Sequence, residues 1–349
     1  MNFVSLILAL AIISGQLIKV PLSTGGISLL DLSIFIFCTI VLIKIKIKRP
    51  ALFFYWAGVF ILICILSLIF TPLHLGPNEF LTSFLYIFRF FIYILFAYLI
   101  YIGAFKMPNV LIHSGISLAI LGLLQFIFLP DLGFLNKYGW DPHFYRTVST
   151  FLDPNFAGAF FVLTLLLIQK KHKVFFVITF LALLTTFSRS SYLMFLTSGL
   201  TLSVFEKSKK IAFKTVLLFL ILLLGFQIYT QLVSKPRHID REQSASFRLS
   251  TWQQGWQLFS SHPILGVGFN AYRYGLREYG LADAKFLQNH GSSGNDSSLL
   301  FVAATTGIIG LISYLFFLFS LIWKSKNYLL ISAITGLLIH SFFANSGQF

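Results

Sequence analysis

The sequence predicts an all-α protein that crosses a membrane about eleven times. Three observations predict this fold: 57% of the 349 residues are hydrophobic, only 11% are charged, and apolar runs recur from residue 2 to residue 345. A spanning helix needs about 20 mainly apolar residues, because the hydrocarbon core is roughly 30 Å thick and its backbone groups must be hydrogen-bonded internally. We therefore expect a polytopic transmembrane helical bundle.

The predicted spans follow one another with brief polar interruptions. Residues 1–15 contain no Lys or Arg, which favours a first span over a cleaved signal peptide. Cys38 and Cys64 fall within predicted spans, and we interpret both as packing residues. The expected spans are 3–19, 27–43, 51–70, 80–102, 110–129, 156–168, 174–187, 191–205, 211–230, 299–322 and 328–344.

Basic clusters occupy every second connection and predict the orientation of the chain. By the positive-inside rule the clustered side is cytoplasmic, so the N-terminus is expected inside and the C-terminus outside. Of eleven acidic residues, Glu206 alone falls in a predicted cytoplasmic connection. Topology thus explains much of the net charge of +15, and we expect no nucleic-acid partner. The clusters lie at 44–49, 106, 170–173, 207–214 and 324–326.

We expect one membrane domain, residues 1–349, with a dominant outward loop at 231–298 between the ninth and tenth spans. A second outward connection, 130–155, is also long enough to hold structure. The dominant loop is rich in Trp, Tyr, Gly and Arg, which indicates an ordered subdomain and not a linker. Within it, residues 246–260 predict an amphipathic helix that ends before Pro263.

Arg89 lies in the middle of the fourth predicted span. A charge in that position is costly unless it faces a polar cavity, a partner or an anionic ligand. Two interpretations are open: a structural pair, for which Asp31 on the second span is the candidate, or a phosphate-binding role.

Arg189 is flanked by hydroxyl residues between two short apolar segments. An arginine near a helix N-terminus offers a fork of donors together with backbone N–H groups, which suits a phosphate or pyrophosphate. The alternative is a helix cap whose arginine reaches to the membrane interface.

The dominant loop carries further candidates at the start of its predicted helix. Arg248 begins the stretch that contains Trp252 and Trp256. Positive charge attracts an anionic head group, although many such residues are ordinarily solvated. The tryptophans suit either an interfacial belt or a sugar-stacking surface.

Asp296 and His290 precede the tenth span. The carboxylate of Asp296 could accept a proton from an acceptor hydroxyl, or could serve as a plain helix N-cap. His290 is the weaker candidate for a catalytic base. The sequence shows no metal-ligand spacing, so we expect neither a metal nor a cofactor.

Three stretches resemble the O-antigen ligase and O-antigen polymerase superfamily of bacterial envelope glycan enzymes. They are Thr150-Phe151-Leu152-Asp153-Pro154-Asn155-Phe156-Ala157-Gly158, Ser188-Arg189-Ser190, and the block that runs from Arg248 and Trp252 through His262-Pro263-Ile264-Leu265-Gly266-Val267-Gly268-Phe269 to Thr306-Gly307-Ile308-Ile309-Gly310. The resemblance covers about the last two hundred residues and implies a GT-C-like bundle in the bacterial plasma (inner) membrane, with the large loop on the periplasmic or extracytoplasmic side.

The resemblance implies a metal-independent glycosyltransferase that moves glycan from undecaprenyl pyrophosphate to an acceptor hydroxyl at the outer face. Its partners would be the lipid-linked donor, a glycan or lipid acceptor, membrane lipid and other polysaccharide assembly proteins. Arg189 and Arg248 would hold the pyrophosphate and stabilise charge on the leaving group.

In this chain Asp296-Ser297 is followed by nine residues and then by Gly307-Ile308-Ile309-Gly310. Ligases of the family carry a His at the position of Asp296, whereas polymerases often carry an Asp-Asn or related pair there. The resemblance therefore favours a repeat-unit polymerase over a ligase that attaches glycan to lipid A core or another surface acceptor. A transporter or flippase of a lipid-linked anion is the third hypothesis, although the sequence shows no inverted repeat of hydropathy.

Overall fold

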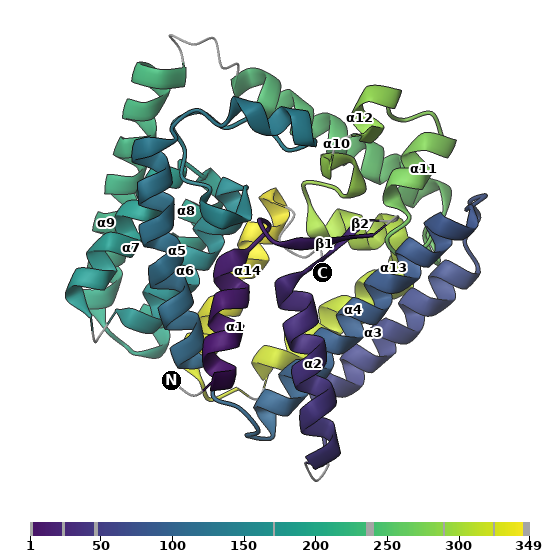
Figure 1. Cartoon of the computed structure of the whole chain (residues 1–349), viewed down its shortest axis with the longest axis horizontal. Coiled ribbons are helices and arrows are strands. Elements are labelled where there is room, and N and C mark those ends of the chain that lie inside the picture. The colour runs from purple at the N-terminus through teal and green to yellow at the C-terminus, as the bar shows by residue number, and fades with distance from the viewer. Residues whose placement is uncertain are drawn as a thin grey trace. The chain divides into compact units, whose positions relative to one another are not determined.

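The computed structural model describes residues 3–22, 25–44, 48–169, 172–234, 241–288, 290–323 and 325–344. This part of the chain is almost entirely helical (Figure 1). Five of its helices are long and apolar enough to cross a membrane, which confirms an all-α polytopic membrane protein. They are α3 (Leu52–Ile69), α4 (Pro77–Tyr101), α5 (Pro108–Phe128), α9 (Lys209–Tyr229) and α13 (Ser298–Trp323).

The other six predicted spans are also helices, but shorter ones. At 1.5 Å per residue, helices of about 12 to 17 residues rise only about 18 to 26 Å. The number of crossings, about eleven, therefore stays a prediction. These helices are α1 (Phe3–Ser14), α2 (Leu29–Lys44), α6 (Pro154–Ile168), α7 (Lys173–Thr186), α8 (Arg189–Phe205) and α14 (Tyr328–Phe343).

The first predicted span is too long by five residues. The helix α1 ends at Ser14, because Gly15 turns into the left-handed region at φ 54° and the Gln16 N–H bonds to the carbonyl of Thr150 at 2.9 Å. The chain then forms a small antiparallel hairpin of β1 (Lys19–Leu22) and β2 (Gly25–Ser28), in which Lys19 pairs with Ser28.

The chain divides into two compact units. Unit 1 contains residues 1–17, 108–247 and 325–346, with helices α1, α5 to α9 and α14. In it α14 packs against α8, where Gly336 of α14 lies against Ser198 of α8. Small residues let neighbouring membrane helices approach closely. Unit 1 also holds η1 (Gly133–Tyr138), η2 (Ser149–Phe151) and the π-helical turn η3 (Thr230–Ser234).

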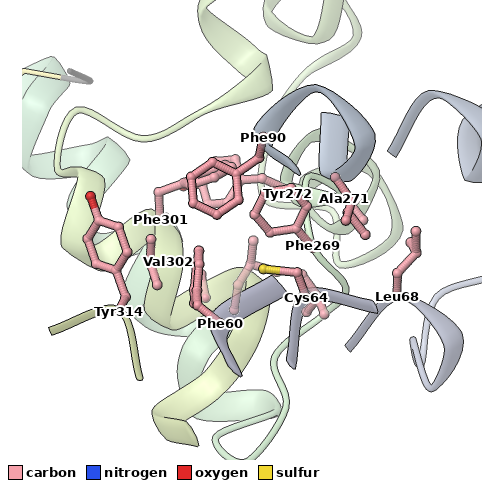
Figure 2. Close-up of a cluster of buried hydrophobic side chains, with 14 of the residues drawn as sticks. Phe60, Cys64, Leu68, Phe90, Phe269, Ala271, Tyr272, Phe301, Val302 and Tyr314 are labelled. Atoms are coloured by element: carbon pink, nitrogen blue, oxygen red, sulfur yellow. The ribbon is translucent and has the colours of Figure 1, made fainter. Parts of the chain in front are cut away.

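Unit 2 contains residues 18–107 and 248–324. Its core is an aromatic cluster in which Phe60 of α3 and Phe90 of α4 meet edge to face at 5.7 Å (Figure 2). Phe269 and Tyr272 from the dominant loop join the same cluster, together with Phe301 of α13. The loop thus shares a hydrophobic core with the spanning helices of unit 2.

The dominant loop is partly helical, as predicted. The helix expected at 246–260 is α10, which starts earlier and ends two residues before Pro263, where a prolyl ring would break the helix. The loop helices are α10 (Arg241–Ser261), α11 (Tyr272–Glu278), α12 (Ala284–Gln288) and the 3-10 turn η4 (His290–Ser293).

Candidate functional site

Asp296 is held by a residue of α10. The Thr251 hydroxyl lies 3.0 Å from Asp296 Oδ2 and 2.9 Å from the carbonyl oxygen of Arg248, one helical turn earlier. Thr251 is buried, whereas Arg248 and Asp296 are half-buried. The Asp296 carboxylate is therefore tied to the turn of α10 that begins at Arg248, through Thr251 and the backbone carbonyl of Arg248.

A second set of hydrogen bonds fixes the backbone beside Asp296. The Asn295 amide donates to the Thr251 carbonyl and, at 2.9 Å, to the Tyr272 hydroxyl, and its Oδ1 accepts the Ser297 N–H at 2.9 Å. Burial raises the pKa of Tyr272, and the charge of Asp296 raises it further, so the phenol stays protonated. The segment that carries Asp296 is consequently pinned to α10 and α11.

The helix α13 is capped by Ser297, whose hydroxyl accepts the Leu300 N–H at 3.4 Å. The Asp296 side chain reaches across to α10 instead. The hydrogen bond described for the Asp296 side chain is thus to α10, and the role of its carboxylate stays a prediction.

Two parts of the third resemblance stretch meet at a break in α13. Gly307 has a left-handed φ of 67°, and the loop that follows α10 lies against this interruption. Val267 and Gly268 donate N–H groups to the carbonyls of Ala304 and Thr305 at 2.9 and 3.1 Å. A Cβ on Gly307 would lie 2.1 Å from the Ile264 carbonyl oxygen, so glycine is required by both conformation and space.

The third span secures the same junction from the other side. Ser67 of α3 has its hydroxyl 2.7 Å from the Leu265 carbonyl and 2.6 Å from that of Thr305, and Thr71 donates to the Val267 carbonyl at 2.6 Å. The Thr305 carbonyl lies in α13 just before the break, whereas the Leu265 and Val267 carbonyls lie in the loop after α10, so these hydroxyls bond to both sides of the junction. The glycine motifs of the loop therefore build a scaffold beside the Asp296 segment.

Arg189 lies in unit 1 and is the first residue of α8. Ser188 caps this helix through the Ser191 N–H, and Arg189 is exposed, with its guanidinium carbon 5.8 Å from the centre of the Phe226 ring. The predicted position near a helix N-terminus is thus observed, with the arginine side chain exposed.

The other two resemblance stretches meet behind Arg189. Asn155 Oδ1 accepts hydrogen bonds from the Ser188 and Ser190 hydroxyls at 2.7 and 3.3 Å, and Ser191 donates to the Asn155 carbonyl at 3.1 Å. Asp153 caps α6 by accepting the N–H groups of Asn155 and Phe156. The N-termini of α6 and α8 are therefore joined by buried hydroxyls.

Arg146 supports the hairpin and was not singled out from the sequence. Its Nε donates to the Thr186 carbonyl at 2.8 Å and its Nη2 to that of Phe187 at 3.4 Å. Phe187 has a left-handed φ of 48°, which is strained for an aromatic residue, and its ring stacks on Tyr229 at 4.1 Å. Arg146 thus holds the strained residue that immediately precedes Ser188 and Arg189.

Arg89, in unit 2, forms an ion pair with Asp31. Its Nε lies 2.7 Å from Asp31 Oδ1, which also accepts the Tyr93 hydroxyl at 2.8 Å. The structural pair considered from the sequence is therefore present. The Arg89 side chain is still 36% exposed and lines a pocket between α2 and α4, so the pair does not enclose it.

The remaining candidates are less closely defined. Trp252 is half-buried and Trp256 is 60% exposed on α10, so Trp256 is open to either a membrane interface or a sugar. The backbone of His290 begins η4, but its side chain lies outside the described residues. Among the described residues, no group of three or more His, Cys, Asp or Glu side chains could hold a metal ion.

Sequence reasoning missed Thr251, Asn295 and Arg146. Each acts by bonding to residues at least 40 positions away, and a hydroxyl, an amide or an arginine next to a helix end carries no local pattern that marks such a contact. The density of polar residues around the resemblance stretches was the one feature of the sequence that could have pointed to these residues.

The fold and these polar junctions define a class: a polytopic helical membrane protein whose charged side chains gather at helix ends. Residues 174–315 match the family model described as O-antigen ligase, which confirms the resemblance of this part of the chain to the O-antigen ligase and polymerase superfamily, a family of glycosyltransferase-like enzymes. The match includes Arg189, Arg248, Asp296 and both sides of the α13 break. No curated protein matches the chain.

Proposed function

We propose that the protein is a metal-independent membrane glycosyltransferase that transfers glycan from undecaprenyl pyrophosphate to an acceptor hydroxyl, with repeat-unit polymerisation as its reaction. The observation that carries this proposal is the hydrogen bond from Thr251 to Asp296, one helical turn from Arg248. In the proposed site the Arg248 guanidinium lies with this carboxylate, so that a base serves proton removal and a cation serves leaving-group stabilisation.

In the proposed reaction the acceptor oxygen attacks the anomeric carbon of the donor sugar. The bond from that carbon to the pyrophosphate oxygen breaks, and undecaprenyl pyrophosphate leaves with the bonding electron pair. The hydroxyl proton passes to the Asp296 carboxylate. Arg248 stabilises the negative charge that grows on the pyrophosphate as the bond breaks.

Arg189 is assigned to the same ligand by the resemblance and by its exposed position at the N-terminus of α8. The helix dipole and the guanidinium both favour an anion there. Arg89 is proposed as a lipid-phosphate contact and Trp252 as a sugar or interface contact. His290 remains an alternative base.

Orientation completes the proposal. The basic connections face the cytoplasm, so Asp296 and Arg248 would lie at the outer face of the bacterial plasma membrane, where lipid-linked glycan is consumed. A periplasmic or extracytoplasmic placement of the loop agrees with a donor that needs no nucleotide sugar.

The test uses purified full-length protein in detergent with lipid-linked repeat units, and a gel of the glycan products. Wild type should produce a ladder, while Asp296→Asn and Arg248→Ala should each lower the rate at least about 100-fold. Matched controls are Asp283→Asn, which changes an exposed loop carboxylate, and Arg277→Ala, which removes an exposed arginine paired with Glu79 at 2.6 Å. Full activity in both site variants would refute the assignment.

Two other functions make different predictions. A ligase should leave finished polymer on undecaprenyl pyrophosphate in a deletion strain, whereas loss of a polymerase should leave single repeat units. A transporter or flippase should yield no elongated glycan in detergent under any condition, and that result would count against both enzymes.

A further inference from the structure

A pocket of about 350 Å³ lies between α2 and α4 in unit 2. Its volume is within the range of roughly 300–1,000 Å³ that small-molecule sites usually have. The wall from α2 includes Leu32 and Phe35, and the wall from α4 includes Leu85 and Phe88, all of them exposed apolar side chains.

The helix α4 contributes two parallel stripes to this pocket. Thr82, Tyr86, Arg89 and Tyr93 follow one another at helical spacing and carry the polar groups that α4 brings to the pocket. Leu85, Phe88 and Ile92 form the apolar stripe beside them. Since residues three or four apart share a helix face, a ligand in this pocket meets polar groups along one side and hydrocarbon along the other. That division fits an amphiphile.

The ion pair leaves Arg89 with capacity for another anion. Asp31 engages only its Nε among the described hydrogen bonds, and Asp31 itself is only 15% exposed against 36% for Arg89. The carboxylate also accepts from the Ser28 N–H and hydroxyl, at 3.0 and 2.6 Å, and from Tyr93. The guanidinium carbon also lies 5.9 and 5.6 Å from the ring centres of Tyr86 and Tyr93, and its exposed part favours contact with water or an anion in a spanning helix.

Lys19 is a second cation near Arg89 and Asp31. Burial lowers the pKa of Lys19 on β1, the charge of Arg89 lowers it further, and Asp31 opposes this effect. Arg89 and Asp31 line the pocket, and the Lys19 side chain lies within 3.4 Å of the position that a Cβ on the lining residue Gly26 would take. The formal charges of these three groups sum to +1. The net charge complements a phosphate.

We propose that this pocket binds a polyprenyl phosphate lipid, with the isoprenoid chain on Leu32, Phe35, Leu85 and Phe88 and the phosphate against Arg89 and Lys19. The inference rests on the proposed function, because the donor of that reaction is a polyprenyl lipid. It adds the place where the lipid enters the protein from the bilayer, a groove between α2 and α4.

The test measures binding of undecaprenyl phosphate to the purified full chain by native mass spectrometry. Leu32→Trp and Leu85→Trp fill the groove from opposite walls and should weaken binding at least tenfold. The control is Ile40→Trp, also on α2 and 51% exposed, about 12 Å further along the helix axis and outside the pocket lining. It should bind within twofold of wild type.

The phosphate contact is tested separately from the chain contact. Arg89→Gln should weaken the binding of undecaprenyl phosphate at least tenfold and change the binding of uncharged undecaprenol less than twofold. The Arg89→Gln/Asp31→Asn double variant, which is charge-balanced, should do the same. Equal loss of both lipids, or equal competition by phosphatidylglycerol, would overturn the assignment of the occupant. Unchanged binding in both folded tryptophan variants would refute the assignment of this groove as the lipid-binding site.

Glycan elongation in the same preparations distinguishes failure of the groove from failure of the enzyme. Wild type that binds undecaprenyl phosphate but elongates nothing would leave the groove standing and refute the proposed function. Elongation with an unchanged KM for donor in both tryptophan variants would refute the groove alone.

Discussion

The hydroxyl of Thr251 lies 3.0 Å from the carboxylate of Asp296, 45 residues later in the chain. This contact ties the start of α13 to α10, the helix that carries Arg248. It gives Thr251 the role of a positioning residue, because it acts on the proposed reaction through Asp296 and Arg248.

Thr251→Val should lower kcat/KM for glycan elongation about 10- to 100-fold. A hydrogen bond to a charged group contributes about 1.5–3 kcal/mol, and the isosteric valine removes the donor without opening a cavity. Thr251→Ser keeps the hydroxyl and should remain within a few-fold of wild type. An equal loss of kcat/KM in the serine and valine variants would argue against this role of the hydroxyl.

Arg146→Ala should reduce elongation strongly, although we do not assign Arg146 to the ligand. The variant frees the carbonyls of Thr186 and Phe187 and relaxes the strained turn that precedes Arg189. Each lost charged hydrogen bond costs about 1.5–3 kcal/mol, so the melting temperature should fall as well. Arg189→Ala is the comparison, since it should lower activity without a comparable loss of thermal stability. Equal melting temperatures for the two variants would contradict this division of roles.

Gly307→Ala should destabilise the protein by about 2–5 kcal/mol. The left-handed backbone costs an alanine about 1–2 kcal/mol, and the overpacking against the Ile264 carbonyl adds about 1–3 kcal/mol. Gly280→Ala is a matched control, because Gly280 also has a positive φ, 62°, but nothing lies within 4 Å of its Cβ position. Thermal unfolding in detergent should separate the two variants, and similar melting temperatures would show that the close approach is unimportant.

The protein should lose stability in mild acid because of His143. Burial, together with the charge of Arg146, lowers the pKa of His143 to about 3, whereas its unfolded value is 6.5. Between these values the unfolded state binds one proton more, so stability falls as pH falls below 6.5. The loss reaches at most about 2 kcal/mol at about pH 5. His143→Gln should therefore lose less melting temperature than wild type between about pH 7 and about pH 5; parallel losses would argue against this origin.

The sequence predicted the helices well because hydropathy is a local property. All eleven apolar runs are helices with ends within a few residues of expectation, except where the Gln16 contact with Thr150 ends α1 early. The site was predicted only in part. Arg189 at a helix N-terminus and Arg89 beside Asp31 follow from local context and membrane cost. The contacts of Thr251, Asn295 and Arg146 could not be predicted, because their partners are distant carbonyls and hydroxyls that leave no pattern in the chain.

The junction at Gly307 constrains the order in which the protein can be assembled. Ser67 and Thr71 are synthesised early, but the carbonyls they serve lie 196 to 238 residues further on. During translation these hydroxyls can bond only to their own helix or to water. The hydrogen bonds between residues 263–268 and α13 can form only once α13 has been made and packs against α3. Unit 2 therefore completes its internal hydrogen bonds only after residue 305 has been made, and nascent chains that end before this point should be substrates for membrane quality control.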